Sequence, residues 1–175
     1  TNYRWLIIAF IIGIVCSILL YFLGETLYGN SYENWYYYIG KSYNIPTEID
    51  QQSKLAMFGV MALTGMTFSP IGEELFFRGI VHSSFANSVG NKRASIIDSS
   101  AFAIVHISHF GLIFTNQQWQ FLTVPTLIWV LSMFCVSILF YRCRKNSGSI
   151  LGAILCHSAF NLGMIYCIFY PIIGS

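Results

Sequence analysis

Long apolar stretches separated by short polar turns dominate this sequence. Residues 6–23 form an unbroken apolar run of 18 residues after Arg4, long enough to cross a bilayer as a helix. No small-residue cleavage site follows this run, so we interpret it as a membrane span rather than a signal peptide. Further apolar stretches lie at residues 54–89, 94–114, 121–141 and 149–170. The pattern predicts an all-α, polytopic transmembrane bundle of about five to six helices, with five spans.

The stretch at residues 54–89 is longer than one span needs, and Pro70 and Gly72 lie near its middle. Proline removes one helix hydrogen bond and clashes with the preceding turn, so we expect a kink or break there. The long polar segment at residues 24–53 contains a block of aromatic residues at 35–38. Because such side chains favour the headgroup region, this segment is either an interfacial element or a plain extramembrane loop. A polar link is expected at residues 116–120.

Composition supports lipid as the solvent for most of the chain. Hydrophobic residues make up 55% and charged residues only 9%, against about 25% charged in a soluble domain. The net charge of +2 is too small to indicate nucleic-acid binding. Five cysteines without a CxxC pair argue against a disulfide framework or a zinc knuckle. We expect one membrane domain over residues 1–175, in contact with the lipid bilayer.

Basic residues predict the orientation of the bundle. Arg4 and the turns at residues 91–93 and 142–145 are basic, whereas residues 24–53 and 114–120 are not. Since Lys and Arg gather on the cytoplasmic side, the N-terminus is expected in the cytoplasm and the C-terminus outside. The protein is therefore expected to be an integral, multi-pass protein of a plasma membrane.

Ionisable side chains are rare inside membrane spans and usually face the protein interior for a functional reason. Here they gather in three of the predicted spans, at Glu73, Glu74, Arg78 and His82, at Asp98, His106 and His109, and at His157 and Asn161. We expect one polar site where these spans meet. His82 and His109 are interpreted as structural, and Asp98 is expected near the inner surface, paired with Lys92 or Arg93.

Helical spacing separates the two adjacent glutamates. Arg78 follows Glu74 at i+4, so the two can form an ion pair, whereas Glu73 points about 100° away around a helix of 3.6 residues per turn. One cation cannot neutralise two carboxylates in a dry place. Glu73 is therefore the candidate general base. His157 and Asn161 are also spaced i, i+4 and reach toward one point in the bundle.

Three short motifs carry a resemblance to a known family. The string Glu73-Glu74-Leu75-Phe76-Phe77-Arg78-Gly79 resembles the EExxxR motif of the CPBP (CAAX protease and bacteriocin-processing, or Abi) membrane proteases. Phe102-Ala103-Ile104-Val105-His106 resembles their FxxxH motif, and His157-Ser158-Ala159-Phe160-Asn161 resembles HxxxN. The motifs occur in order, each in its own apolar stretch. The resemblance covers roughly residues 60–165, which we interpret as the protease core.

The resemblance implies peptide hydrolysis by an activated water molecule, as in the type II CAAX prenyl endopeptidases. Carried over to this chain, Glu73 takes the proton of the water while His106 orients it. The ion pair of Glu74 with Arg78 would position Glu73. No cofactor is implied.

The third motif and the substrate follow from the same resemblance. His157 and Asn161 would donate hydrogen bonds to the developing oxyanion, and one such donor contributes about 3 kcal/mol. The substrate would be a peptide or protein precursor in or at the membrane. The short chain resembles bacterial members, whose targets are peptide precursors such as pheromones or bacteriocin leaders. The oligomeric state is not readable.

Other functions use the same residues. The two glutamates and two histidines could hold zinc in a metalloprotease, although HExxH is absent and Arg78 would repel a cation. A serine protease is disfavoured because no GxSG motif occurs, and a cysteine protease because Cys156 points away from the adjacent His157. A non-catalytic immunity factor or scaffold stays open. So does a proton channel, since buried carboxylates and histidines also carry protons.

Overall fold

The computed structural model describes residues 1–46, 48–115 and 117–173. Its α-helices are α1 (Tyr3–Tyr28), α2 (Trp35–Ser42), α3 (Gln51–Glu74), α4 (His82–Val89), α5 (Asn91–Val105), α6 (Thr123–Ser147) and α7 (Ile150–Cys167). Two π-helical segments, η1 (Leu75–Val81) and η3 (Ile168–Ile172), join α3 to α4 and extend α7. The 3₁₀ turn η2 (His106–Ser108) follows α5, and β1 (Leu112–Thr115) pairs antiparallel with β2 (Gln118–Phe121). The predicted all-α bundle is confirmed.

Four of the described helical segments are long and apolar enough to cross a membrane, namely Tyr3–Tyr28, Gln51–Val89, Thr123–Ser147 and Ile150–Ile172. α5 has 15 residues, so at 1.5 Å per residue it is about 22 Å long and shorter than a hydrocarbon core of about 30 Å. The prediction of a full span over residues 94–114 is therefore wrong. The predicted link at residues 116–120 is part of the β1–β2 hairpin, with Asn116 outside the described residues.

α5 ends early because the side chain of His106 bonds the carbonyl of Phe102, which would otherwise accept the backbone N–H of His106 in a continued α-helix. His106 Nδ1 lies 2.7 Å from the carbonyl oxygen of Phe102, one turn back. The backbone N–H at this position points instead to the carbonyls of Ala103 and Ile104, which tightens the chain into η2. Gly111 then adopts a positive φ of 134°, and the chain continues into the hairpin.

A kink or break was predicted at Pro70; helix α3 continues through this residue, so the break does not occur. Proline leaves the carbonyl of Met66, four residues earlier, without its usual N–H donor. The hydroxyl of Ser158 on α7 donates to this carbonyl at 2.6 Å. Asn161 Nδ2 donates to the neighbouring carbonyl of Gly65 at 2.9 Å. Side chains of α7 thus satisfy the helix where its own ladder is interrupted, and the irregular geometry comes later, in η1.

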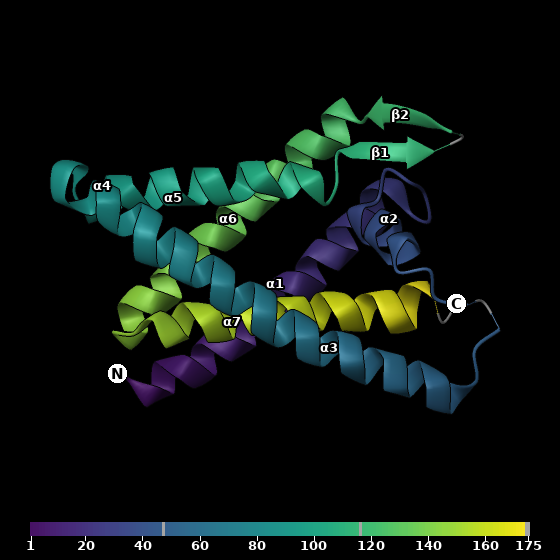
Figure 1. Ribbon diagram of the computed structural model, residues 1–175, viewed down its shortest axis with the longest axis horizontal. Helices are drawn as coiled ribbons and strands as arrows, with labels where there is room; N and C mark the ends of the chain where they lie inside the picture. The colour runs from purple at the N-terminus through teal and green to yellow at the C-terminus, as the bar shows by residue number, and fades with distance from the viewer. Residues whose placement is uncertain (47, 116, 174–175) are drawn as a thin grey trace.

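The helical elements run alternately from one end of the molecule to the other (Figure 1). The N-terminus, the α4–α5 turn and the α6–α7 turn lie at one end, on the left of the figure. α2, the hairpin and the C-terminal end of η3 lie at the other. The three basic segments identified in the sequence therefore share one end, which we call the basic end. This is the alternation expected of a multi-pass bundle, with α5 as its short member.

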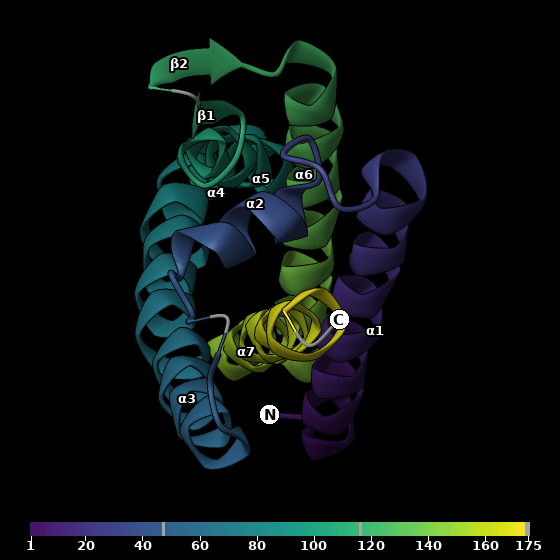
Figure 2. The ribbon, with the colours of Figure 1, turned by 90° about the vertical axis from the view of Figure 1, so that its right-hand side faces the viewer.

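Helix α2 packs into the bundle, between α3 on one side and α1 and α6 on the other (Figure 2). Its Trp35 and Tyr36 side chains are fully buried. The hydroxyl of Tyr36 donates to the carbonyl of Ser17 at 3.0 Å, and Trp35 Nε1 donates to that of Leu20 at 3.3 Å. Within residues 24–53, of which residue 47 lies outside the described part, helix α2 therefore packs against the bundle and lies over the site described below.

Small residues allow α1 and α7 to approach closely. A Cβ atom at Gly13 would lie 2.1 Å from the backbone carbonyl of Cys156, and one at Gly163 would lie 2.9 Å from the Cβ of Ser17. Backbone atoms cannot move aside as a flexible side chain can. α1 therefore packs directly against the helix that carries the third motif.

Replacing Gly13 with alanine should lower the stability of the protein in detergent. Overpacking of this kind costs about 1–3 kcal/mol, which thermal unfolding of the purified protein will measure. Gly59→Ala is the matched control, since nothing lies within 4 Å of a Cβ there and alanine favours a helix by about 1 kcal/mol over glycine. An equal response of the two variants would contradict the close packing of α1 on α7.

Candidate active site

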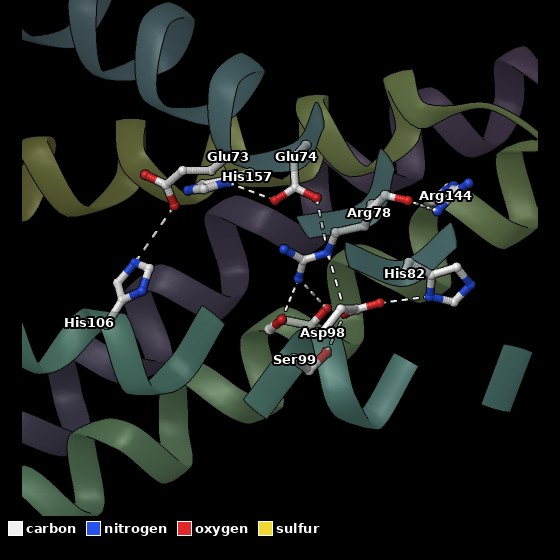
Figure 3. Close-up of polar contacts among 10 residues, drawn as sticks. Glu73, Glu74, Arg78, His82, Asp98, Ser99, His106, Arg144 and His157 are labelled. Carbon is white, nitrogen blue, oxygen red and sulfur yellow. Dashed lines mark hydrogen bonds and ion pairs between the residues drawn. The ribbon is translucent and has the colours of Figure 1, made fainter. Parts of the chain in front are cut away.

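Glu73 and His106 face each other from two different elements (Figure 3). Glu73 lies in the last turn of α3, and His106 begins η2. Glu73 Oε2 is 3.9 Å from His106 Nε2. The imidazole is buried and the carboxylate is partly exposed. The structure thus brings together the first glutamate and the histidine of the second motif.

Hydrogen bonds determine which ring nitrogen of His106 carries the proton. Its Nδ1 is 2.7 Å from the carbonyl oxygen of Phe102. Because a carbonyl can only accept, Nδ1 must donate, and Nε2 of the neutral ring is then an acceptor directed at Glu73. Trp129 Nε1 donates to the backbone carbonyl of His106 at 2.9 Å, and the Phe102 ring stacks on the imidazole at 4.2 Å. The ring is therefore held in one orientation.

The carboxylate of Glu73 is bonded on one oxygen only. Its Oε1 accepts a hydrogen bond from the hydroxyl of Ser69. Its Oε2 is buried and has no hydrogen-bond partner among the described residues. A carboxylate oxygen and an unprotonated imidazole nitrogen are both acceptors. Facing each other at this distance, they can bind a molecule that donates two hydrogens, as water does.

Glu74 turns away from Glu73 and is bound by two partners. Its Oε2 lies 3.1 Å from Arg78 Nε, the ion pair expected from the i, i+4 spacing. Its Oε1 lies 2.9 Å from His157 Nδ1, a contact that spacing within one helix could not predict. Glu74 and Arg78 are both fully buried. The first and third motifs are therefore joined through Glu74.

Arg78 is held by groups from two neighbouring elements, α5 and α6, besides Glu74. Its Nη2 donates to the backbone carbonyl of Ser137 at 2.9 Å and to the hydroxyl of the same residue. Its guanidinium lies over the rings of Phe102 and Phe140, at 4.8 and 5.6 Å. Sequence reasoning missed Ser137. The only signal for it was a polar side chain within the apolar stretch at residues 121–141.

Asp98 is buried and does not pair with Lys92 or Arg93 as predicted. Its Oδ2 lies 2.7 Å from His82 Nδ1, and its Oδ1 lies 4.0 Å from Arg78 Nε. His82 is also buried. Asp98 contacts these groups because a carboxylate in the protein interior must face a cation or donor. These contacts lengthen the polar cluster from His157 and Glu74 to His82 (Figure 3).

His157 and Asn161 lie on the same side of α7 and have different partners. His157 Nδ1 is engaged by Glu74, so Nε2 donates a hydrogen bond only when the ring is protonated. The Phe140 ring stacks on the imidazole at 4.6 Å. Asn161 was expected at the oxyanion, and here its amide donates to the carbonyl of Gly65. One of its two amide hydrogens is thus already used to fix α3.

A cavity of about 440 Å³ connects these groups. Glu73, His106, His157 and Asn161 all line it, together with His109. Apolar side chains from α6 and α7 form much of the remaining wall, and α2 closes it from one side. Within the part of the chain that the structure describes, no group of three or more His, Cys, Asp or Glu side chains is arranged to hold a metal ion.

Comparison with known families identifies the chain. The model of the type II CAAX prenyl endopeptidase Rce1-like family matches residues 55–163, which is more than half of the chain. The chain belongs to this family. All residues that line the cavity from the three motifs fall within the match. No curated protein and no solved structure matches the chain.

Membership of the Rce1-like family confirms the resemblance drawn from the motifs. With the apolar helices, it makes this chain an integral membrane protein of a protease family. The match begins within α3, so α1 and α2 lie outside it. The Rce1-like region thus contains the glutamate and the histidines that line the cavity, while α2 from the unmatched region covers them.

The hydroxyl of Ser158 should stabilise the protein only because Pro70 leaves the carbonyl of Met66 without a backbone N–H donor. Ser158→Ala is expected to cost about 1 kcal/mol of unfolding free energy. In a Pro70→Ala background the new N–H can bond the carbonyl of Met66, so the same change should cost less. A double-mutant cycle of thermal stability in detergent measures this coupling.

Ser84→Ala is the control for this cycle, because the Ser84 hydroxyl bonds a carbonyl of its own helix at an exposed position. Its effect should be the same in both backgrounds. If Ser158→Ala costs equally much with and without Pro70, the proposed role of Ser158 is wrong.

Proposed function

We propose that this chain is an intramembrane endopeptidase that hydrolyses a peptide bond with water activated by Glu73 and His106. The observation that carries the proposal is the facing pair of acceptors, Glu73 Oε2 and His106 Nε2, at 3.9 Å inside a cavity. A bridging water would donate one hydrogen bond to each of these two acceptors. Its oxygen lone pairs would then be directed at a substrate carbonyl. Membership of a protease family supports the same reaction.

In the first step the water oxygen attacks the scissile carbonyl carbon while the carboxylate of Glu73 takes a proton from the water. His106 Nε2 accepts a hydrogen bond from the second hydrogen, which stays on the oxygen, and so keeps the water aligned. The resulting tetrahedral intermediate carries its negative charge on the former carbonyl oxygen. Glu73 then returns the proton to the leaving nitrogen as the carbon–nitrogen bond breaks. This general acid–base cycle ends with a free carboxylic acid and a free amine.

His157 is the proposed donor to the oxyanion. Glu74 engages Nδ1 of the ring at 2.9 Å, and the stacked Phe140 ring keeps its plane fixed. In the proposed transition state an Nε2–H would bond the developing charge, and one such donor contributes about 3 kcal/mol. Asn161 has one amide hydrogen left after its bond to Gly65 and would serve as the second donor.

The proposed substrate is a membrane-associated peptide or protein precursor. The apolar wall of the cavity suits a segment that approaches from the bilayer, and no cofactor is required by this mechanism. We further propose a bacterial plasma membrane as the location, with the basic end in the cytoplasm. The gathering of Lys and Arg at that end supports this orientation.

Neutralising Glu73 should stop hydrolysis without unfolding the protein. Glu73→Gln keeps the size of the side chain and removes the base, so kcat should fall by about 10²–10⁴-fold. Substrates for the assay are membrane peptides that mass spectrometry detects in cells with the variant but not in cells with the wild type. The measurement is the cleavage of these peptides by the purified protein in detergent. Glu48→Gln, at an exposed position, is the matched control and should leave the rate unchanged.

His106→Gln should lower kcat in the same assay, since the amide cannot reproduce the oriented acceptor. Thermal stability of each variant will show that it is folded. Full cleavage by a folded Glu73→Gln or His106→Gln protein would refute the mechanism and favour a non-catalytic role.

Cleavage should also survive a strong chelator. The mechanism uses a carboxylate and an imidazole on the water and requires no ion, so dialysis against EDTA should leave kcat unchanged. The assay is the same peptide cleavage, before and after dialysis. Loss of activity with recovery on addition of zinc would replace this mechanism with a metal-dependent one that uses the same residues.

A further inference from the structure

A second cavity lies at the basic end of the molecule and has a volume of about 850 Å³. Its wall contains Lys92 from α5 and Arg142, Arg144 and Lys145 from the end of α6. These are four of the nine Lys and Arg residues of the chain, and the wall contains no Asp or Glu. No residue lines both this cavity and the one that holds Glu73. The second cavity is therefore a separate cation-lined space.

None of the four cations forms an ion pair with a carboxylate among the residues that the structure describes. The buried acid Asp98 is engaged by His82, which lines the cavity, and lies near Arg78. Four unpaired positive charges around one space repel one another. A bound anion would remove this repulsion.

The rest of the wall indicates the kind of anion. Ser149 and Ile150 place the start of α7 in the wall beside the end of α6. The partial charges of these two helix ends oppose each other, so the positive charge of the wall comes from its Lys and Arg side chains. Ile96, Ile138 and Ile150 supply apolar surface, and Ile96 is 47% exposed. Lys and Arg side chains beside an apolar flank match a phosphate headgroup carried on a lipid.

We propose that this cavity binds a phosphate group, carried by an anionic phospholipid at the basic face of the membrane or by a soluble phosphate. Arg142, Lys145 and Lys92 are exposed side chains that contact the phosphate oxygens. Arg144 has a second task, since its Nη1 donates to the backbone carbonyl of Arg78. The ligand thus lies next to the π-helical segment η1, whose Arg78 pairs with Glu74.

The test is native mass spectrometry of the purified protein with phosphatidylglycerol or phosphatidylcholine added in detergent. The wild type should retain phosphatidylglycerol in preference to phosphatidylcholine. The double variant Arg142→Gln, Lys145→Gln should reduce that retention by about tenfold or more, as expected for losing two contacts to an anionic headgroup. Arg144 is left unchanged so that its bond to Arg78 is preserved.

A matched comparison uses neighbouring residues. Lys92→Gln should weaken retention, whereas Arg93→Gln should not, because Arg93 is exposed and does not line the cavity. Equal retention of the two lipids by the wild type, or equal effects of the two substitutions, would overturn a lipid site. Thermal unfolding of every variant will verify that loss of binding is not loss of fold.

The second part of the test measures the binding of inorganic phosphate. If it binds the wild type and is lost in the double variant while the two lipids are retained equally, the site takes a soluble phosphate. If neither probe distinguishes wild type from double variant, the phosphate site does not exist. Glu73→Gln should bind both probes as the wild type does, so this test stands independently of proteolysis.

Discussion

The structure depends on one buried carboxylate, that of Glu74, placed between Arg78 and His157. Removing an ion pair from water carries a large desolvation cost, which only close partners and further hydrogen bonds can offset. Here those partners come from different elements: His157 from α7, Ser137 from α6 and Asp98 from α5 all contact the pair directly or through Arg78. Loss of one partner from a buried pair costs about 3–5 kcal/mol. The same contacts that hold the helices together keep Glu74 turned inward, and this leaves Glu73 as the carboxylate that faces the cavity.

Much of the bundle and part of the site followed from the sequence because they depend on local spacing. Apolar runs located the long helices, and the i, i+4 rule placed Arg78 beside Glu74. The end of α5 could not be predicted in this way. It depends on His106 bonding the carbonyl of Phe102 and on Trp129, 23 residues later, bonding the carbonyl of His106. Continuity of α3 through Pro70 likewise depends on α7. Hydrophobic periodicity contains no information about such donors.

Contacts between distant segments also explain what the sequence left wrong within the site. Asp98 follows Lys92 and Arg93 closely, so a local pair was the natural prediction, yet its partner is His82 across the α4–α5 turn. Asn161 was assigned to the oxyanion, and one of its amide hydrogens also bonds α3, which spacing within α7 could not show. A polar group inside the bundle is thus satisfied by a donor or acceptor that lies close in space, not only in sequence. Motif resemblance identified which residues meet, and only the packing of the helices determined which pairs form.

Through the π-helical segment η1, one residue contacts both the candidate active site and the basic end of the molecule. A π-helical turn is wider than an α-helical one, and such segments are frequent at functional sites. Here the segment begins directly after Glu74, and it places Arg78 on the buried side with its side chain toward Glu74. The backbone carbonyl of the same residue is accessible to Arg144 from the α6–α7 turn. The bond from Arg144 therefore links the basic end to the backbone of the residue that pairs with Glu74. Because Glu73 and Glu74 are adjacent, the proposed base is connected to the basic end through a continuous series of contacts.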